Sequence, residues 1–351
     1  TIPALLPPEN TDENTDLPTP YQSLGARGVN HLASKLVISL FPASTAFFRF
    51  RLNDEIKDEL GADTQQVEEA MRKLEEKGMR TMEAGNLRAN LNVVAKHLIV
   101  TGNILLHAPP SGETRTYRLD QYCVIRNPRG KILEAVIRED IHPSTLSPEI
   151  CEAVGVDHQK DSRKDVQIFT CIKRVDGNMF KWYQEINEVV VPGSEGRAKE
   201  ENSPYIFLRW SDAGGEDYGR SMVEEYLGDL RSLEGLSKAI IQFSAIAAKI
   251  VFLVQPNAVT SSEELAKSNA GDFVQGSPTD VSALTLDKYA DFRVAKSVID
   301  ELTLRLSYAF LLPSGTTRDA ERVTAVEIRA VAQELEDVLG GVYSTLAQEL
   351  Q

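Results

Sequence analysis

Ala309-Phe310-Leu311-Leu312-Pro313, continued after a short gap by Arg318-Asp319-Ala320-Glu321-Arg322-Val323-Thr324, separates two helix-forming segments near the end of this sequence. Proline has no backbone N–H to donate, so Pro313 predicts the end of the first helix. Thr324 and Glu327 have the spacing of a capping box, which predicts the start of the second. Residues 312–323 are therefore expected to form a loop that is fixed at both ends.

The segment after the capping box has the periodicity of an amphipathic helix. Its apolar residues recur every three or four positions; they are Ile328, Val331, Leu335, Val338, Val342, Leu346 and Leu350. No stop signal follows the stripe, so we expect a helix over 324–351 that is cut at Gln351. A long helix behind a short Gly/Thr/Arg loop, with no catalytic motif beside it, indicates a mechanical part rather than an active site.

The composition is that of a soluble globular protein with an acidic surface. The 351 residues, 42% hydrophobic and 26% charged, fit two or three packed units. The formal net charge is −14. Affinity for phosphate comes from clustered lysines and arginines, so this charge argues against a surface that holds nucleic acid tightly. It suits a surface that DNA must pass without sticking.

Cysteine usage and hydropathy limit the class of protein further. The three cysteines, Cys123, Cys151 and Cys171, have no CxxC spacing, which indicates a reducing cytosol rather than a disulfide framework or zinc site. The chain starts at Thr1 without a signal peptide, so we expect a trimmed N-terminus. The apolar run 239–254 is shorter than a membrane span and contains charge, so no membrane contact is expected.

The first two thirds of the chain divide into helices followed by strands. Residues 1–18 form an acidic, proline-containing arm. A helix is predicted from Thr19-Pro20 to Phe41-Pro42, and another from Thr64 to Leu91, broken at Gly78 or Gly85 and continued to Val100. Short alternating strands over 103–210, with hairpin turns at 127–130 and 176–178, predict a small antiparallel sheet or barrel.

The last third predicts two long helices around a compact insertion. The first helix covers about 219–254 and has a small-residue middle at Ser244–Ala248. The insertion, 255–290, is expected to hold a short helix at Ser262–Ser268 and strands near Asp272–Gln275 and Val281–Leu284. The second long helix runs from Tyr289 to Leu311, with Val294, Val298, Leu302, Leu306 and Ala309 on one face. The fold class is therefore α+β, with the insertion at the tip of an antiparallel helix pair.

Motifs of enzymes are weak in this sequence. Gly130-Lys131 is followed by Ile132, so it does not form a phosphate-binding loop, and the glycines at 214, 215 and 219 indicate a hinge rather than a dinucleotide site. The five histidines never fall at metal-ligand spacing. Adjacent carboxylates such as Asp54-Glu55 and Glu224-Glu225 diverge on a helix and read as solvated faces. We expect no enzyme activity, no cofactor and no metal.

Three blocks of this sequence resemble the portal, or head-to-tail connector, proteins of T7-like short-tailed bacteriophages. The first block is Thr19-Pro20-Tyr21-Gln22, Gly25-Ala26-Arg27-Gly28, Asn30, Leu32-Ala33-Ser34-Lys35-Leu36 and Leu40-Phe41-Pro42. The second is Tyr218-Gly219-Arg220-Ser221 with Glu225-Tyr226-Leu227-Gly228-Asp229-Leu230. The third is Glu321-Arg322-Val323-Thr324-Ala325, Glu327-Ile328, Glu334-Leu335-Glu336-Asp337 and Gly340-Gly341-Val342-Tyr343-Ser344.

The resemblance implies a phage portal fold and a dodecameric ring at one capsid vertex. Mapped onto this chain it implies a wing over 1–217, with a helical part at about 19–100 and a β part at about 103–210. It places a stem helix at 218–250, a clip at 251–290, a second stem helix at 291–311, a tunnel loop at 312–323 and a long wing helix at 324–351. The family's crown is expected after 351 and is absent from this sequence.

The same resemblance assigns roles to particular residues. In the tunnel loop, Gly315, Thr316, Thr317, Arg318 and Arg322 would face DNA and contact its phosphates from the side. The alternative is a solvated loop in which the arginines pair with Asp319 and Glu321. Two further sets complete the assignment: Glu263, Glu264, Phe273 and Val274 as the docking surface of the clip, and Ala245, Ala247 and Ala248 as the packing surface of the stem.

The function implied is a channel for double-stranded DNA, without sequence specificity, during genome packaging and ejection. Its implied partners are the terminase packaging motor, tail adaptor proteins, the scaffold and the major capsid protein. The motor would supply ATP hydrolysis, and the protein would assemble in the host cytoplasm and reside in the virion. The alternatives are a ring-forming tail adaptor or other structural virion protein and, from another class, a metal-dependent nuclease.

Overall fold

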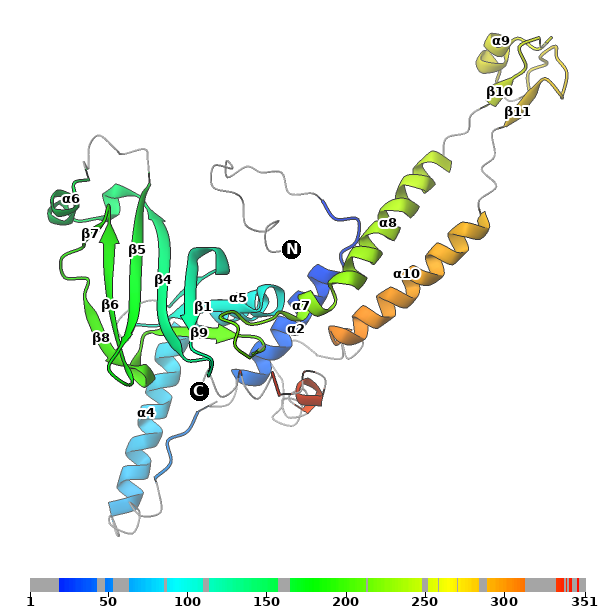
Figure 1. The fold of residues 1–351 in the computed structure, drawn as a ribbon. Coiled ribbons are helices and arrows are strands. Elements are labelled where there is room, and N and C mark those ends of the chain that lie inside the picture. The colour runs from blue at the N-terminus through cyan, green and yellow to red at the C-terminus, as the bar shows by residue number, and fades with distance from the viewer. Residues whose placement is uncertain are drawn as a thin grey trace. The chain divides into compact units, whose positions relative to one another are not determined.

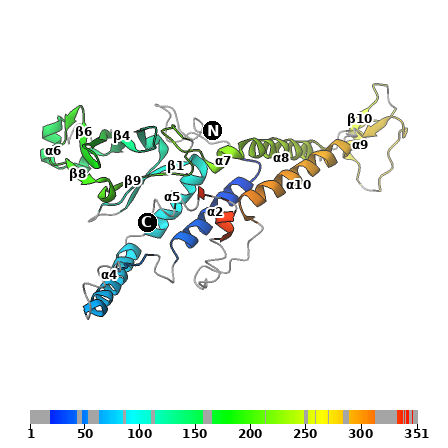
Figure 2. The same ribbon diagram turned by 60° about the horizontal axis from the view of Figure 1, so that its bottom comes forward.

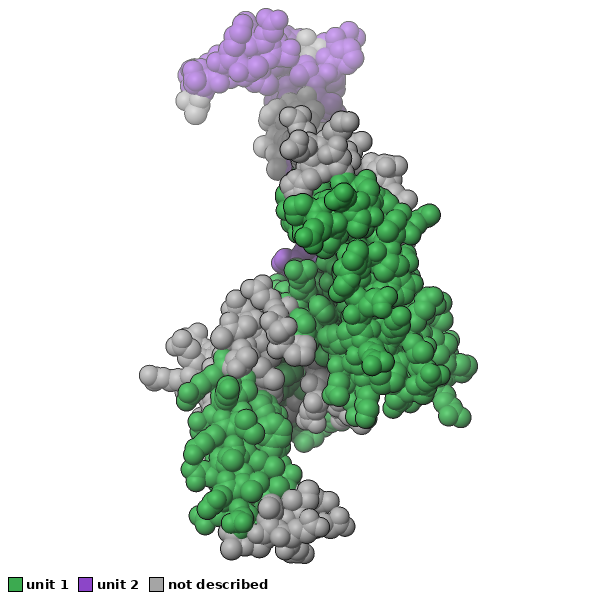
Figure 3. Space-filling model, turned by 90° about the vertical axis from the view of Figure 1, so that its left-hand side faces the viewer, with its two compact units in different colours: residues 1–16, 26–227, 309–351 green, residues 17–25, 228–308 purple. Residues whose placement is uncertain are grey.

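The computed structural model describes residues 19–42, 48–52, 63–84, 87–109, 114–156, 165–212, 214–247, 252–257, 259–269, 271–283, 289–312, 333–337, 339, 341–342 and 346. The chain splits into two compact units, which Figure 3 distinguishes by colour. Unit 1 contains residues 1–16, 26–227 and 309–351, and unit 2 contains residues 17–25 and 228–308.

Three helices in the described part of unit 1 precede its first strand along the chain, as Figure 1 shows. α2 (Leu24–Leu40) buries Leu32 and Leu36, one turn apart. α4 (Thr64–Ala84) and α5 (Leu87–Thr101) follow, and α5 packs on β1 (Asn103–His107). Of the two predicted break positions, Gly78 lies inside α4, whereas the boundary between α4 and α5 falls after Ala84, next to Gly85 in the sequence. The Phe48 ring lies 3.0 Å from where a Cβ would be at Gly78, so packing accounts for the small residue.

Two open antiparallel sheets make up the β part of unit 1. The three-stranded sheet has the order β2–β1–β9, with β2 at Arg115–Tyr117 and β9 at Tyr205–Arg209. The second sheet has the order β3–β4–β5–β6–β7, with β8 also paired to β6. Its strands are β3 (Tyr122–Arg126), β4 (Ile132–Ile141), β5 (Val166–Val175), β6 (Met179–Ile186), β7 (Val189–Val190) and β8 (Gly196–Lys199). Of the two predicted alternatives, the sheet is therefore confirmed, and the described strands form no closed barrel.

The main core of the β part is formed by side chains from both sheets. It contains Leu105, Tyr117, Tyr122, Val124, Ala135, Ile137, Ile172, Phe180 and Phe207. Alternation along β5 follows the prediction, since Ile168, Thr170 and Ile172 are buried. A second cluster joins α6 (Pro148–Val154) to the far end of the sheet. The predicted hairpin turns are both present, with Gly130 and Gly177 at positive φ of 77° and 66°.

Unit 2 is a helix pair that carries a small module at one end. α8 (Leu227–Ala247) and α10 (Tyr289–Ala309) run side by side in both ribbon views, and the module lies beyond their far ends (Figures 1 and 2). The Phe243 and Phe292 rings stack with centroids 3.8 Å apart, and Arg305 donates to Asp229 at 2.7 Å. The predicted helix pair with an insertion at its tip is confirmed in this unit.

The predicted first long helix differs from the observed one at both ends. Met222–Glu225 forms a separate short helix, α7, and the chain bends at Tyr226 before α8 begins. The Tyr226 ring lies 6.4 Å from the Phe310 ring, so a tertiary contact accompanies the interruption of the helical pattern. At the other end, Phe252–Val254 is a strand, β10, paired with β11 (Val281–Ala283). A short apolar run with a β-branched residue is compatible with either structure, and strand pairing decides it here.

Of the other elements predicted in the module, the short helix is present and one strand is not. The short helix is confirmed as α9 (Ser262–Lys267), with Ser261 as its N-cap. The predicted strand at Asp272–Gln275 is wrong, because these residues join no ladder and the Asp272 side chain accepts from the Asn269 N–H at 2.6 Å instead. In the described part of the chain, no helix has the length and hydropathy of a membrane span.

Candidate functional site

The tip of unit 2 is organised around the carboxylate of Asp280. Its Oδ2 accepts from the Val259 N–H at 3.0 Å, the Thr260 N–H at 3.2 Å and the Thr260 hydroxyl at 3.0 Å. The Thr260 Oγ1 in turn accepts from the Ser277 N–H at 3.0 Å. A Cβ at Gly276 would lie 2.2 Å from that oxygen, so only glycine fits there. Side-chain and backbone hydrogen bonds thus hold the described part of this module together, and its buried residue there is the polar Thr260.

The hydrogen bond donated by the Thr260 hydroxyl lowers the pKa of Asp280. Asp280→Asn should therefore loosen the tip, because an amide is a weaker acceptor for three donors. Faster hydrogen exchange at Val259, Thr260 and Ser277, with α10 unchanged, is the expected result.

The stabilisation from a carboxyl with a lowered pKa is complete above about pH 3.9 and is lost as the pH falls through the folded-state pKa. Equal protection factors in the wild type and in Asp280→Asn at pH 6, after correction for the intrinsic exchange rate, would contradict this assignment.

The four residues predicted to form the docking surface lie in this module. Phe273 is 105% exposed relative to a free side chain, and Val274 is half-buried. Glu263 and Glu264 are exposed in the first turn of α9, where the positive end of a helix favours carboxylates. Val259, 81% exposed, is an apolar neighbour that the sequence did not single out. The module thus presents apolar side chains to solvent over a polar frame.

The helix pair also leaves apolar side chains uncovered. On α10, Phe292, Ala295, Ile299, Leu302 and Leu306 form the inner face, and the last two are buried. Val294 and Val298, predicted for that face, are instead exposed by 66% and 40%. Leu304 and Tyr308, at 55% and 62%, and Ile241 on α8, at 48%, are exposed as well.

The predicted stem-packing residues lie at the far end of α8. Ala245 is exposed in that helix. Ala247 is the last residue of α8. Ala248 lies outside the described residues. A packing role for these three alanines stays a prediction.

Within unit 1, the break after α10 is held against α2. Phe310 is fully buried, and a Cβ on Gly28 would lie 2.6 Å from its Cγ. Leu311 adopts a left-handed φ of 56°, which is unfavourable for a residue with a side chain. The Leu311 carbonyl accepts a hydrogen bond from His31 Nε2 at 3.1 Å. Burial, followed by the nearby Lys35 charge, lowers the pKa of His31, so the imidazole is neutral and Nε2–H is the donor.

The terminal helix is tied to α2 by a salt bridge. Lys35, 3% exposed, donates to Glu334 at 3.0 Å. Leu335 and Leu346, two members of the predicted apolar stripe, are buried. The capping box at Thr324 and Glu327 lies outside the described residues, as do all five tunnel-loop residues: Gly315, Thr316, Thr317, Arg318 and Arg322. Both the residue before the tunnel loop and a residue after it therefore contact α2.

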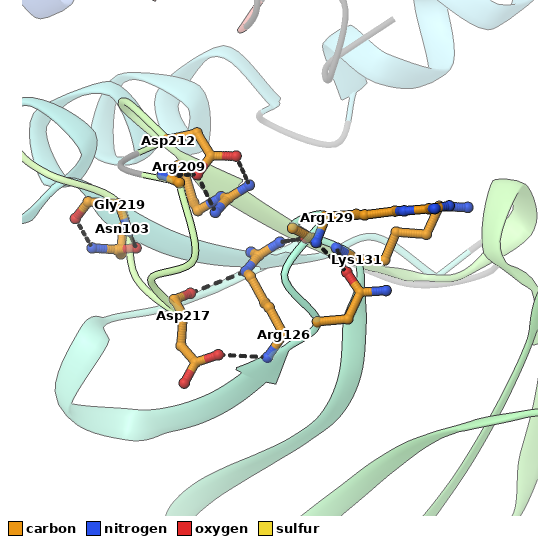
Figure 4. Close-up of polar contacts among 11 residues, drawn as sticks. Asn103, Arg126, Arg129, Lys131, Arg209, Asp212, Asp217 and Gly219 are labelled. Atoms are coloured by element: carbon orange, nitrogen blue, oxygen red, sulfur yellow. Dashed lines mark hydrogen bonds and ion pairs between the residues drawn. The ribbon is translucent and has the colours of Figure 1, made fainter.

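A polar cluster that the sequence did not reveal joins β1, the β3–β4 turn and the segment 209–219 (Figure 4). The buried Asn103 side chain bonds both backbone groups of Gly219: its Nδ2 donates to the carbonyl at 2.8 Å, and its Oδ1 accepts from the N–H at 2.7 Å. A Cβ at Gly219 would lie 2.8 Å from the Ser211 carbonyl oxygen. Only the glycines at 102 and 219 could have hinted at this close approach.

Two arginines complete the cluster. Arg209 pairs with Asp212 at 2.9 Å. The Arg126 guanidinium donates to the carbonyl oxygens of Asp217 at 3.0 Å and Gly130 at 2.9 Å, and the Arg126 N–H donates to the Asp217 carboxylate at 2.6 Å. Among the described residues, no group of three or more His, Cys, Asp or Glu side chains gathers as metal ligands would.

This α+β chain, with its helix pair, tip module and anchored terminal helix, matches the family model of the "Bacteriophage head to tail connecting protein" over residues 4–351. The chain belongs to this family. The portal proteins of Escherichia phage T7 and Enterobacteria phage T3 are each 43% identical to it over 361 residues, covering 100% of this chain and 67% of the relative. That of Enterobacteria phage SP6 is 34% identical over 357 residues, covering 100% and 69%. The chain thus spans about two thirds of these relatives.

A solved structure is similar at a more distant level. One chain in the neck of an empty gene transfer agent particle is 12% identical, with a TM-score of 0.44, covering 94% of this chain and 76% of the other. This likeness is too distant to define any detail of the present fold.

Proposed function

We propose that this chain is the subunit of a dodecameric portal ring, set at one capsid vertex where head and tail join. Family membership over residues 4–351 supports the assignment. The ring would conduct double-stranded DNA in packaging and in ejection, without sequence specificity. The chain itself would catalyse nothing, and the packaging motor would supply the ATP hydrolysis.

The observation that supports ring assembly is the exposed apolar face of the helix pair. Val294, Val298, Leu304 and Tyr308 on α10 are 40–66% exposed. Exposed apolar patches of this kind mark contacts with other chains. A head-to-tail contact of such a face with a different face of the next copy closes into a ring when the rotation fits. We therefore assign α8 and α10 to the stem and place their outer faces between neighbouring copies.

The remaining divisions follow the family's organisation. Residues 1–217 and 324–351 would be wing, 251–290 the clip and 312–323 the tunnel loop. The clip would bind the terminase motor first and the tail adaptor proteins later, through Phe273, Val274, Glu263 and Glu264. Arg318 and Arg322 would touch the DNA backbone inside an otherwise acidic channel. The wing would contact the scaffold and the major capsid protein, and the ring would assemble in the host cytoplasm before it becomes part of the virion.

The ring and its interface can be tested together by light scattering and negative-stain microscopy. The wild-type chain should form rings with a central hole. Val294→Asp with Val298→Asp places charges in the proposed interface, so this variant should shift to monomers or open arcs. Leu74→Asp, on the exposed side of α4, is the matched control and should leave the rings intact. A monomeric wild type would contradict the portal assignment, and doubly substituted rings of normal mass would contradict the stem interface.

A further inference from the structure

The β3–β4 turn carries more positive charge than its surroundings neutralise. Arg174 pairs with Glu200, Arg209 with Asp212, and Arg126 lies against Asp217. Arg129 and Lys131, in the turn itself, are exposed and form no ion pair in the described part of the chain. Counted over these described side chains alone, five cations face three carboxylates, in a chain whose formal net charge is −14. The hydrogen bond from Arg174, with the nearby Lys131 charge as a smaller cause, lowers the pKa of Glu200. Figure 4 shows Arg129 and Lys131 on the side of the cluster away from Asn103 and Gly219.

The turn is held in one conformation by its own polar groups. The Asn127 Oδ1 accepts from the Arg129 N–H at 3.0 Å and from the Lys131 N–H at 2.9 Å. The Gly130 N–H donates to the Asn127 carbonyl at 2.8 Å. Phosphate sites commonly use free backbone N–H groups that converge in a concave nest. Here three successive backbone N–H groups already have partners within the turn, so the turn presents two exposed side-chain cations on a fixed backbone and no cradle for phosphate. This favours carboxylates on an extended segment as the partner.

Residues 1–18 of the sequence supply carboxylates of this kind. It carries Glu9, Asp12, Glu13 and Asp16, and no lysine or arginine. Fully extended, a segment of this length reaches at most about 60 Å. The chain that follows it is fixed to α8, because the Tyr21 N–H donates to Glu234 Oε1 at 2.8 Å. The Lys238 Nζ also lies 5.7 Å from the centre of the Tyr21 ring. The acidic segment therefore leaves from the helix pair whose outer face we assign to contact with the next copy.

We propose that the β3–β4 turn, through Arg129 and Lys131, is the docking site for the acidic segment 1–18 of the neighbouring copy. This inference rests on the proposed ring. A single exposed ion pair contributes little to stability. A tethered segment, however, meets its site at a high effective concentration, so weak pairs suffice, and the ring repeats the contact at every interface. The segment would then act as a strap between subunits.

Zero-length cross-linking tests the contact directly. Rings are assembled from a mixture of unlabelled and ¹⁵N-labelled chains and treated with a carbodiimide, which joins a lysine amine to a carboxylate in contact with it. We expect a peptide that links Lys131 to one of the four carboxylates of segment 1–18, with the two halves differing in isotope label. Lys131→Arg is the matched control, because it keeps the charge and removes the reactive amine. This variant should form rings and lose that cross-link.

A second measurement concerns the strength of association. Arg129→Ala with Lys131→Ala should weaken ring association about two- to thirtyfold at low salt, the range that two exposed ion pairs allow, and this difference should shrink at high salt. Lys73→Ala with Arg80→Ala removes the same charge from α4 and should change association less.

The outcomes separate the two proposals. Rings that give no mixed-isotope cross-link would overturn the strap and leave the ring standing, and cross-links only within one isotope would do the same. A wild type that scatters as a monomer would overturn both. Rings that lack the cross-link but bind a DNA fragment, and lose that binding in the double alanine variant, would reassign the turn to nucleic acid.

Discussion

Phe310→Ala is expected to lower the free energy of unfolding of unit 1 by about 3–5 kcal/mol, the cost of removing a buried aromatic side chain. Phe310 is fully buried where the chain leaves α10, against Gly28 of α2 and near the Tyr226 ring. Urea denaturation followed by circular dichroism measures the change. Phe273→Ala is the matched control, because the Phe273 side chain is 105% exposed and should alter stability little.

The complementary substitution tests the same contact from the other side. Gly28→Ala places a Cβ 2.6 Å from Phe310 Cγ and should destabilise by about 1–3 kcal/mol through overpacking. Combined with Phe310→Leu, which removes ring atoms, the cost should be less than the sum of the two single changes. Strict additivity would show that the glycine and the ring do not share the space that the structure gives them.

The second large effect is expected at the Lys35–Glu334 pair. Glu334→Gln removes a charged hydrogen-bond partner from a lysine that is 3% exposed, so the free energy of unfolding should fall by about 1.5–3 kcal/mol. Hydrogen exchange should increase in α2 and in residues 333–337. The control is Glu69→Gln, whose partner Lys73 is 73% exposed, and a surface pair of this kind contributes at most about 1 kcal/mol. Equal effects at the two sites would mean that burial of Lys35 does not strengthen the interaction.

Much of the local structure was predictable because it depends on neighbours in sequence. Alternation along β5 and the turn at Asp176-Gly177 specify the hairpin without distant contacts. The helix over 289–309 was predicted, and Leu302, Leu306 and Ala309 of its predicted apolar face are buried, but Val294 and Val298 are not. Val294 and Val298 belong to a second apolar stripe beside the true inner one, and periodicity alone cannot say which stripe faces the chain's own partner helix.

The polar contacts that shape the site were beyond sequence reasoning because they join distant residues. Asn103 and Gly219 are 116 positions apart, and His31 and Leu311 are 280 apart. Neither pair belongs to a motif whose spacing fixes the geometry. Glu263, Glu264, Phe273 and Val274 were assigned to one surface by resemblance, and the structure does place them in one small module. The polar frame around Asp280 that supports this module could not be read from the sequence.

Tyr226 and Phe310 lie close together in unit 1, and the residues between them, 228–308, form most of unit 2. Most of unit 2 is therefore an insertion in the sequence of unit 1. The two residues stand at the edges of a long excursion of the chain, yet their ring centroids are 6.4 Å apart within unit 1. Unit 1 thus holds the two ends of the inserted segment close together. The entropic cost of closing a loop grows only with the logarithm of its length. Lengthening or shortening the inserted segment should therefore change the free energy of unfolding of unit 1 little. The helix pair and its tip module can therefore change in length while unit 1 continues to fold in the same way.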